Sequence, residues 1–364
     1  MNKSTFGRHF TVTTWGESHG KAIGAVVDGC PAGLPLCEED IQKLLDRRKP
    51  GQSRYTTMRK EGDQVEILSG VFEGRTTGTP ISLLIWNKDQ RSKDYGNIAY
   101  SYRPGHADYT FDAKYGFRDY RGGGRSSGRE TAARVAAGAI AEKILDSVGV
   151  SFMSYTKAIG PVTVETFDKE EIFRNAFYMP DAKAAAKAAD YVETCMRSHD
   201  SAGGVIECRV SGVPAGLGNT VFEKLDAVLA QAVMSIGAVK GVEIGEGFHA
   251  AELNGSEDND GFAVKDGGIV KTSNHAGGIM GGMSDGSEIV LRAAVKPTAS
   301  IAQPQDTVTN QGEPLSLEIH GRHDPVIVPR AVVVVESMCA LAIVDALFAN
   351  MSARLDKVQE FYRK

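Results

Sequence analysis

Apolar positions along the chain recur with two periods, which together predict a mixture of helices and strands. Residues 132–145 hold the longest helical pattern, an Ala-rich run with Val, Ile and Leu, and these residues favour helix. The same reasoning predicts helices over 38–48, 127–147, 181–197, 219–235 and 334–350. Short apolar segments, several of them bounded by glycine, predict strands over 10–14, 22–28, 65–73, 80–87, 204–211, 287–295 and 315–320.

The predicted strands cluster between helices without a regular strand–helix–strand alternation, which favours an α+β fold with antiparallel sheets. A Rossmann unit is disfavoured because no G-x-G-x-x-G follows a strand, and the P-loop sequence G-x-x-x-x-G-K-[ST] does not occur. No low-complexity linker interrupts the sequence. We therefore expect one domain rather than two separable ones.

An internal repeat relates the two ends of the chain. Val27–Leu34 (Val-Asp-Gly-Cys-Pro-Ala-Gly-Leu) matches Val210–Leu217 (Val-Ser-Gly-Val-Pro-Ala-Gly-Leu). Glycines at 70, 74 and 78 match those at 278, 282 and 286, and Arg103-Pro104 finds a counterpart in Lys296-Pro297. Three collinear matches predict one domain over 1–364 made of two related halves, about 1–150 and 200–364, packed about a pseudo-twofold axis. A crevice between such halves is a natural ligand site.

The start of the helix predicted over 127–147 carries the most distinctive local sequence. Residues 119–131 read Asp-Tyr-Arg-Gly-Gly-Gly-Arg-Ser-Ser-Gly-Arg-Glu-Thr, with arginines at 121, 125 and 129. Ser127 and Glu130 have the spacing of a capping box. Glycines before a helix N-terminus expose N–H groups that favour anions, and guanidiniums add bidentate donors. This segment taken alone is either an anion site or a plainly capped helix, and the triple glycine favours the first.

Composition is that of an ordinary globular protein, with 42% hydrophobic residues, 24% charged residues and a net charge of −5. Basic residues gather in 47–60, which holds no acid, and in 103–134. Two basic islands on an acidic chain suggest small polyanionic ligands more than nucleic acid, although 47–60 by itself favours a solvated loop. Five scattered cysteines predict reduced thiols without a disulfide framework, and no metal-ligand spacing occurs, so no metal site is expected. We see no apolar run of about 20 residues to span a membrane and no signal-peptide core, which predicts a cytoplasmic protein.

Three histidines lie in turns beside glycine and charged residues. These are His19 in Gly16-Glu-Ser-His-Gly20, His106 in Arg103-Pro-Gly-His-Ala-Asp108, and His323 in Gly321-Arg-His-Asp-Pro325. Histidine exchanges protons near neutral pH, and its charged neighbours tune it. A structural role is as plausible as a catalytic one for each, but three such turns together favour catalysis. The remaining histidines (His9, His199, His249, His275 and His320) are expected to be structural.

Seven collinear motifs resemble chorismate synthase, and they run from near the N-terminus into the C-terminal region. Their members are Gly16–Gly20, Arg47-Arg48 with Arg54, Arg103–Asp108, Gly124–Thr131, Ser273–Gly278, Lys296–Thr298 and Gly321–Pro325. The length is similar to that of the shorter bacterial-type enzymes. The sequence departs from many relatives at Ala299, Val326 and Gly237, none of which removes an expected acid, base or anion clamp.

The resemblance implies an anti 1,4-elimination of phosphate from 5-enolpyruvylshikimate 3-phosphate to give chorismate, the last step of the shikimate pathway. It implies reduced FMN as cofactor with no net redox change, a separate flavin reductase, and NADPH as an indirect reductant. The family fold is a β–α–β sandwich with helices between two antiparallel sheets, assembled as a homotetramer. No nucleic acid or membrane partner is implied.

The resemblance also assigns site residues by position. His19 would protonate the departing phosphate, His106 would protonate the flavin, and Asp324, relayed through Ser127, would assist proton removal. The expected substrate-binding residues are Arg48, Arg54, Arg103, Arg121, Arg129 and Arg322. The expected FMN contacts are Arg125, Ser126, Ser127, Gly237, Ala238, Gly281, Lys296, Pro297, Thr298, Ala299, Ser300 and Arg322.

Two other functions remain open on the residues alone. A flavoprotein oxidoreductase with a phosphorylated substrate could use the same clefts, and it would oxidise NADPH as substrate is consumed. A polyanion-binding module could use the basic islands, but it needs aromatic side chains among the arginines for stacking. Only Tyr55 lies inside 47–60.

Overall fold

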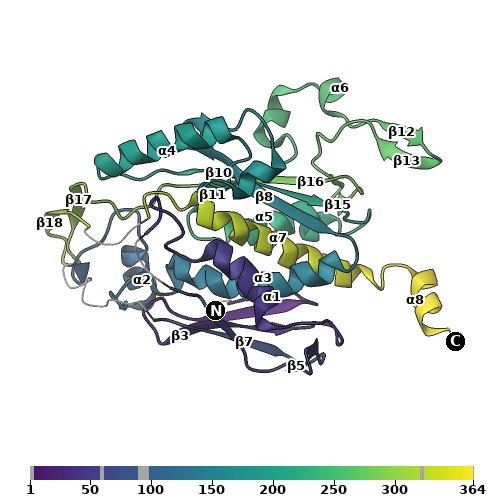
Figure 1. Cartoon of the computed structure of the whole chain (residues 1–364), viewed down its shortest axis with the longest axis horizontal. Helices are drawn as coiled ribbons and strands as arrows, with labels where there is room; N and C mark the ends of the chain where they lie inside the picture. The colour runs from purple at the N-terminus through teal and green to yellow at the C-terminus, as the bar shows by residue number, and fades with distance from the viewer. Residues whose placement is uncertain (1–3, 58–60, 89–97, 320–323, 364) are drawn as a thin grey trace.

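The computed structural model describes residues 4–57, 61–88, 98–319 and 324–363. Two five-stranded antiparallel sheets form the outer layers of a sandwich (Figure 1). The strands of the first sheet, in spatial order, are β1 (Thr5–Phe6), β2 (Thr11–Gly16), β3 (Ala22–Asp28), β7 (Ile81–Trp86) and β4 (Val65–Ile67). Those of the second are β11 (Val239–Ile244), β16 (Ile289–Val295), β10 (Gly204–Ser211), β8 (Ser151–Ile159) and β9 (Val162–Thr163).

Four helices fill the space between the sheets: α1 (Glu38–Arg48), α3 (Thr131–Asp146), α5 (Leu225–Met234) and α7 (Val328–Asn350). The strands turn alternate side chains inward, so that Ile81, Leu83 and Ile85 of β7 are fully buried against this layer. Helices α3 and α7 cross closely, since a Cβ at Gly138 would lie 2.3 Å from that of Ser337. The Ala-rich pattern of α3 is explained by this crossing, because small side chains let two backbones approach.

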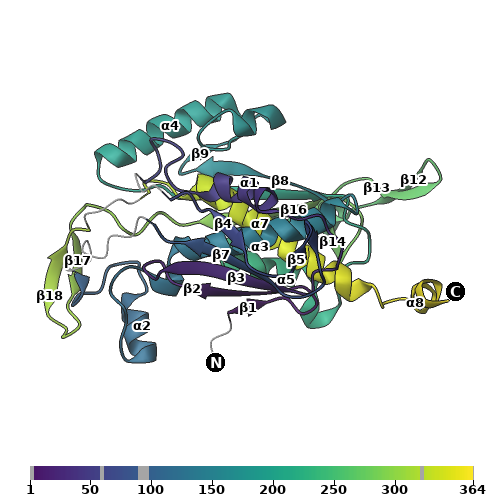
Figure 2. The same cartoon turned by 60° about the horizontal axis from the view of Figure 1, so that its bottom comes forward.

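The remaining elements lie outside the three layers (Figure 2). Helix α4 (Ala182–Arg197) lies on the outer side of the second sheet, and α2 (Asp108–Tyr115), β17 (Gln305–Val308) and β18 (Pro314–Leu317) lie together at one end. The hairpin of β12 (Phe262–Lys265) and β13 (Gly268–Lys271) and the helix α8 (Leu355–Tyr362) project from the other end. The short elements are β5 (Val71–Phe72), β6 (Arg75–Thr76), α6 (Gly255–Asp258), β14 (Ile279–Met280) and β15 (Met283–Ser284).

The two halves repeat one plan. The order β2, β3, α1, β4, β7, α3 recurs as β8, β10, α5, β11, β16, α7, and the second sheet read from β9 has the same layout as the first read from β1. The repeated glycines share one conformation, with φ of 80° at Gly70 against 82° at Gly278, and 79° at Gly78 against 90° at Gly286. Only glycine adopts such angles without strain. The predicted α+β sandwich with an internal duplication is therefore confirmed.

Most predicted elements are present, with differences at their ends. The bounds of α1 are as predicted, whereas α7 begins six residues before the predicted start at 334. The predicted capping box is wrong: the Ser127 hydroxyl accepts from the N–H of Arg129 (3.2 Å), and the Glu130 carboxylate binds Thr14 and Arg134 instead. A short 3₁₀ turn over 128–130 precedes α3 and takes the place of that box. The strands β8 and β11 and the helices α2 and α8 were not predicted.

Helix α7 corrects one expectation about membranes. The helix has 23 residues and its most apolar 18-residue stretch has a mean hydropathy of 2.2, so by length and composition it could cross a bilayer, contrary to the expectation that no run is long enough. The helix lies between the two sheets, where 72% of its most apolar stretch is buried. Its apolar sequence is therefore that of a core helix.

Candidate functional site

Two of the predicted substrate arginines share one buried carboxylate. Arg48, at the end of α1, places Nη1 2.5 Å from Asp63 Oδ2, and Arg129 donates to the other oxygen of the same carboxylate. The side chain of Asp63 is fully buried, and those of Arg48 and Arg129 are only 2% and 4% exposed. Arg48 also donates to the Thr131 hydroxyl (3.1 Å) and to the Gly128 carbonyl (3.0 Å). Segment 47–60 is therefore not simply a solvated loop, as it was expected to be when taken alone, because Arg48 is the buried last residue of α1.

The loop of His19 lies against the glycine-rich segment before α3. A Cβ at Gly122 would lie 2.6 Å from the His19 ring, so only glycine allows this approach. Asn87, at the end of β7, donates to the carbonyls of Glu17 and Gly20 and accepts from Arg129 Nε at 2.8 Å. His19 and Arg129 are thus brought to one place by a residue that lies far from both in the sequence.

Arg125 connects the same segment to the first sheet. Its guanidinium donates to the carbonyls of Gly16 and Thr14 and to the Thr14 hydroxyl, at 3.0, 3.2 and 2.6 Å. The Ser126 hydroxyl donates to the Gly123 carbonyl at 2.7 Å. These contacts fold the glycine run into a compact turn that precedes α3.

A second group of predicted residues lies around His106. Arg103 makes a bidentate pair with Asp108, with both N–O distances at 2.7 Å. Burial raises the pKa of the Asp108 carboxyl, but Arg103 lowers it more strongly, and the net pKa lies below its usual range. His106 Nε2 lies 2.8 Å from the Ser300 hydroxyl. The loop of His106 is therefore held against the segment that follows β16.

That segment, residues 296–300, also touches the end of α5. Lys296 Nζ donates to the Gly105 carbonyl at 2.9 Å, and its backbone N–H donates to the Ala238 carbonyl at 2.9 Å. Ala238 has a φ of 74°, a strained value for a residue other than glycine that is often found at functional sites. Thr298 has a buried hydroxyl oxygen without a hydrogen-bond partner among the described residues. The predicted cofactor residues Ala238 and Lys296–Ser300 are thus gathered at one end of β16.

Asp324 lies beside the arginine pair, where it accepts from the Thr57 N–H (2.8 Å) and from Arg330 Nη1 (2.5 Å). Arg330 also donates to the Arg48 carbonyl, so it joins Asp324 to the end of α1. Arg54 is 72% exposed and pairs with Glu193 of α4. Arg322 lies outside the described residues, as does His323.

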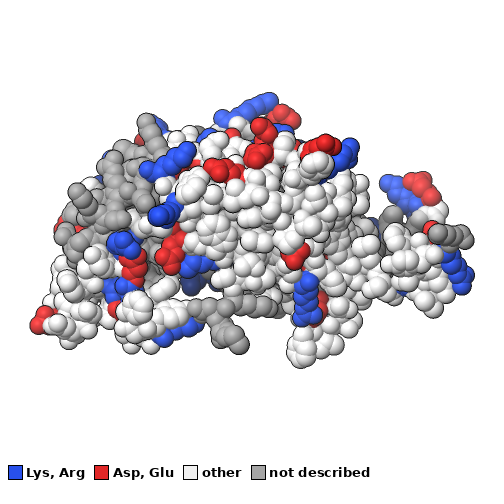
Figure 3. All heavy atoms as spheres, turned by 90° about the horizontal axis from the view of Figure 1, so that it is seen from below, with Lys and Arg blue, Asp and Glu red and all other residues white. Residues whose placement is uncertain are grey.

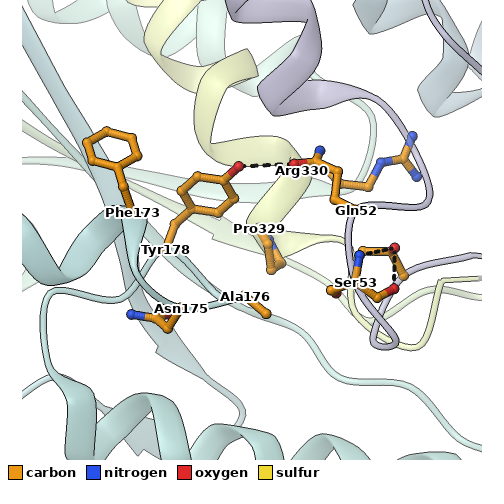
Figure 4. A pocket seen from close by; sticks show the side chains of 9 residues that line it. Gln52, Ser53, Phe173, Asn175, Ala176, Tyr178, Pro329 and Arg330 are labelled. Atoms are coloured by element: carbon orange, nitrogen blue, oxygen red, sulfur yellow. Dashed lines mark hydrogen bonds between the residues drawn. The ribbon is translucent and has the colours of Figure 1, made fainter.

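A small cavity of about 180 Å³ opens next to Arg330 (Figure 4). It is lined by the loop after α1 and by residues 173–178, and the Tyr178 hydroxyl donates to the Gln52 side chain at 3.1 Å across it. Its volume is below the roughly 300 Å³ of most ligand pockets. We therefore regard it as a margin of the site rather than its centre.

Arg121 lies next to Gly122, which touches His19, whereas Gly281 is not gathered with the other predicted residues. Arg121 is half exposed and forms an ion pair with Asp119, two residues away. Gly281 lies in the turn between β14 and β15, where the neighbouring Met283 pairs with Gly218. That turn is near the start of β16, whereas Lys296 follows its end, and seven strand residues span about 20 Å.

Charged side chains are arranged differently at the surface and in the buried site. On the face in Figure 3, basic and acidic side chains alternate in small groups, and large areas carry neither. No group of three or more His, Cys, Asp or Glu side chains among the described residues could hold a metal ion, and the five cysteines are free thiols. Buried charges are concentrated around Asp63 and Asp108, and also around Lys271, which pairs with Asp260 and Asp285.

Comparisons of the sequence and the fold with known proteins identify the family. The sequence model of the chorismate synthase family matches residues 10–348. The chain belongs to the chorismate synthase family. It is 63% identical to the chorismate synthase of Agathobacter rectalis over the full length of both proteins, and 57% identical to that of Chloroflexus aurantiacus over 98% of each. A solved chorismate synthase structure superposes with a TM-score of 0.76 at 33% identity, covering 98% of this chain and 96% of that one.

The function predicted from the motifs is thereby confirmed: the protein is a carbon–oxygen lyase of the shikimate pathway that forms chorismate by eliminating phosphate. The substrate of a chorismate synthase is a polyanion, which agrees with the arginines gathered at the start of α3.

Sequence reasoning missed several side chains of this site. Asp63 and Asn87 hold the arginines, and Ser18, beside His19, has a buried hydroxyl without a partner among the described residues. A signal for Asp63 was present, because the acid-free segment 47–60 is followed at once by Glu61-Gly62-Asp63. Asn87 lies in no recognisable motif.

Proposed function

We propose that this chorismate synthase binds its substrate on the arginines before and within the start of α3, with reduced FMN beside it on the segment that follows β16. The observation that carries the proposal is the gathering of Arg48, Arg129 and His19 at one helix start. Phosphate favours such a place, because the helix dipole and guanidinium donors act together. The predicted roles of Arg54, Arg103, Arg121 and Arg322 in holding the carboxylates and phosphate belong to the same proposal.

The chain has residues that fit a flavin. The unpartnered Thr298 hydroxyl is an orphaned polar group of the kind that a bound cofactor satisfies. The turn of Arg125, Ser126 and Ser127 approaches the end of α5, since a Cβ at Gly237 would lie 3.8 Å from the Ser126 carbonyl oxygen. We propose that FMN lies between these elements. The further contacts are with Ala238, Lys296, Pro297, Ala299, Ser300 and Arg322.

Gly281 can belong to this set only if a second copy of the chain, or a movement of the β14–β15 turn, brings it near. Gly281 lies beyond the other end of β16, and this position gives no direct support to a second copy or to a movement of the turn.

Reduced FMN, when bound, supplies electron density for the departure of phosphate and accepts the hydrogen that leaves the ring. The protein's own residues place and protonate the groups around this chemistry. His19 lies next to the glycine run before α3, in reach of a phosphate held by Arg129, and is proposed to protonate the departing phosphate. His106, held by the Ser300 hydroxyl, is proposed to protonate the flavin.

Asp324 is proposed to assist proton removal. Its carboxylate is oriented by hydrogen bonds from the Thr57 N–H and from Arg330. The Ser127 hydroxyl accepts from the Arg129 N–H and keeps its own hydrogen and a second lone pair for the proposed relay. Substitution of either residue should therefore affect the rate more than substrate binding.

The partners are proposed from the same reasoning. The β12–β13 hairpin exposes Phe262, Val264 and Ile269, each more than 60% exposed, and α8 exposes three large apolar side chains. Apolar surface of this kind is usual where subunits meet, which supports a homotetramer formed by one undivided domain of two halves. The five free thiols support a cytoplasmic location. A separate flavin reductase, with NADPH as its reductant, would supply the reduced cofactor.

Anaerobic incubation of the protein with 5-enolpyruvylshikimate 3-phosphate and dithionite-reduced FMN tests the proposal. We expect chorismate, followed by its absorbance, in many turnovers per flavin and without consumption of reductant. Oxidation of NADPH in proportion to substrate would instead indicate an oxidoreductase. Folded protein that forms no chorismate under these conditions would refute the proposed cofactor.

A further inference from the structure

Asp63 joins the two buried arginines of the site through a single carboxylate. Its Oδ2 accepts from Arg48 Nη1 and its Oδ1 from Arg129 Nη1, so each guanidinium is held by a different oxygen. The two arginines come from different elements, the end of α1 and the turn before α3. The carboxylate therefore helps to fix the spacing between the two cations, together with the contacts of Arg48 to Gly128 and Thr131 on either side of Arg129.

The backbone at Asp63 is also unusual. Its φ is 47°, in the left-handed region where residues other than glycine are strained. Strained residues persist where the surroundings hold them, and they cluster at functional sites. The neighbouring Glu61 is buried as well, and its carboxylate accepts from the Lys88 N–H at 3.1 Å. The turn at 61–63 thus places the Asp63 carboxylate in a buried position between the two arginines.

Each guanidinium has five N–H donors, and its named acceptors other than Asp63 are neutral oxygens. Arg48 donates to Thr131 and Gly128, and Arg129 donates to the Asn87 side chain and to the Trp86 carbonyl. Two guanidinium charges against one carboxylate leave one positive charge in a buried place. A buried charge is costly unless it is paired, so this cluster is suited to an anion that arrives from solution.

The pKa values agree with that charge balance. Burial raises the pKa of the Asp63 carboxyl, but Arg48 and Arg129 outweigh burial, and the net pKa lies below its usual range. Burial lowers the pKa of the Arg48 guanidinium to about 10, against the attraction of Asp63 and with a further lowering by Arg330 and Arg129. Asp63 therefore stays ionised and Arg48 stays charged at neutral pH.

We propose that Asp63 is a positioning residue of the substrate site, which sets the separation of Arg48 and Arg129 and neutralises one of their two charges, so that the pair accepts the substrate's anionic group in one orientation. The proposal rests on the substrate binding proposed above. Asp63 itself does not touch the substrate.

The test is a pair of substitutions with a matched control. Asp63→Glu keeps the charge and moves the carboxylate by one methylene, whereas Asp63→Asn removes the charge. The control is Glu207→Gln, because Glu207 is also a buried carboxylate paired with an arginine, Arg209 at 2.8 Å, but it lies in β10 and outside the proposed site. Steady-state kcat and KM, the Kd of substrate for flavin-free protein, the Kd of oxidised FMN and the melting temperature are measured for each.

We expect Asp63→Glu to weaken substrate binding at least tenfold and to lower kcat/KM about 100-fold, because displacements near 1 Å cost about that much, with the Kd of FMN changed less than twofold. Asp63→Asn should melt earlier, and inorganic phosphate should raise its melting temperature more than that of the wild type, since phosphate replaces the lost negative charge. Glu207→Gln should melt earlier with unchanged KM.

An Asp63→Glu variant with wild-type KM and substrate Kd would overturn the proposal. So would parallel losses of substrate and FMN binding that follow the melting temperature, because these indicate a structural role alone. The wild type is measured first: if it forms no chorismate, the proposed cofactor fails, and the substrate Kd of Asp63→Glu still decides the role of Asp63.

Discussion

The two halves of the molecule share a scaffold but contribute different chemistry. Each half builds its sheet with the same strand order and the same left-handed glycines. The first half brings buried ion pairs to the site, at Asp63 and at Asp108. The second half brings mainly hydroxyls and backbone groups around Thr298 and Ser300, with Asp324 and Arg330 at its margin.

The difference teaches how a duplicated fold obtains an asymmetric site. Glycine turns and apolar strands determine the scaffold, and these are retained in both halves because the same φ angles and the same sheet packing are needed twice. Charged side chains are not needed for the sandwich, so they can differ between halves. The proposed site, in which a polyanionic substrate lies beside a flavin, requires such a difference.

The largest expected effect comes from removing a first-half guanidinium. Arg129→Ala leaves Asn87 without its donor and gives Asp63 one cation instead of two. Truncating a buried charge pair costs about 2–5 kcal/mol, so we expect kcat/KM to fall by roughly 10³-fold, checked by chorismate absorbance. Arg129→Lys is the control, because it keeps the charge without the several fixed donors of the guanidinium. A change below about threefold in Arg129→Ala would contradict the proposed clamp.

Loss of either proposed acid should have the next largest effect. Proton transfer by a positioned side chain contributes about 10²–10⁴-fold, so His106→Ala and His19→Ala should each lose most turnover. Both variants should remain folded and bind FMN, because the His106 contact with Ser300 is one of several that hold the 296–300 segment. Near-normal turnover in either variant, measured with saturating reduced FMN, would refute that residue's role.

The shared scaffold predicts a matched pair of smaller effects. Gly70→Ala and Gly278→Ala occupy repeated positions with φ near 80°, and an added Cβ would lie 2.7 Å from Ile81 Cγ1 and 2.6 Å from the Glu288 carbonyl oxygen. We expect each to lower the free energy of unfolding by about 1–3 kcal/mol, measured by urea denaturation.

Gly74→Ala and Gly282→Ala form the contrasting pair. A Cβ at Gly74 meets nothing within 4 Å, whereas one at Gly282 would lie 2.4 Å from the Asn219 carbonyl oxygen. The second substitution should therefore destabilise more than the first. An equal loss of unfolding free energy in Gly74→Ala and Gly282→Ala would show that the different packing around these two glycines does not change the cost of an added Cβ.

The smallest effect is expected in the helix layer, where the charged side chains belong neither to the proposed substrate site nor to the proposed FMN site. Burial raises the pKa of the Glu142 carboxyl well above its usual value, and the nearby Glu336 raises it further against the attraction of Arg47. A raised pKa in the folded state means that stability is fully present at pH values below the unfolded pKa and is lost as pH rises through the folded pKa. Glu142→Gln should remove this loss.

The measurement for Glu142→Gln is the free energy of unfolding from urea denaturation at pH 5 and at pH 8. The gain over the wild type should be larger at pH 8 than at pH 5. An equal change at both pH values would mean that Glu142 does not titrate differently in the folded and unfolded protein.

Periodicity and repeats were enough to predict the scaffold. The apolar spacing of 38–48 gave the bounds of α1, and the repeated glycines gave the duplication, because both depend on local backbone preferences. The start of α7 was missed because its first turn, with Pro329 at the second position, follows a loop whose pattern is not helical. Strand β8 was missed because apolar and polar residues do not alternate cleanly in its sequence, Ser-Phe-Met-Ser-Tyr-Thr-Lys-Ala-Ile. Pairing with β10 stabilises this strand.

Site residues could be predicted from the sequence only where they lie in a recognisable motif. His19, His106 and the arginines lie in recognisable segments, whereas the partners that hold them lie elsewhere in the chain. Asp63 and Arg129 are 66 residues apart, and the Ser127–Glu130 capping box failed because Thr14 and Arg134 compete for the Glu130 carboxylate. Contacts between distant segments decide such pairings, and local spacing does not contain them.

The most direct test of the central claim measures two affinities in two variants. Isothermal titration gives the Kd of 5-enolpyruvylshikimate 3-phosphate and the Kd of oxidised FMN for Arg129→Lys in the first half and Thr298→Val in the second. The division of chemistry between the halves predicts at least tenfold weaker substrate binding with unchanged FMN binding in Arg129→Lys, and the reverse in Thr298→Val. Parallel loss of both affinities in both variants, with the fold intact, would contradict it.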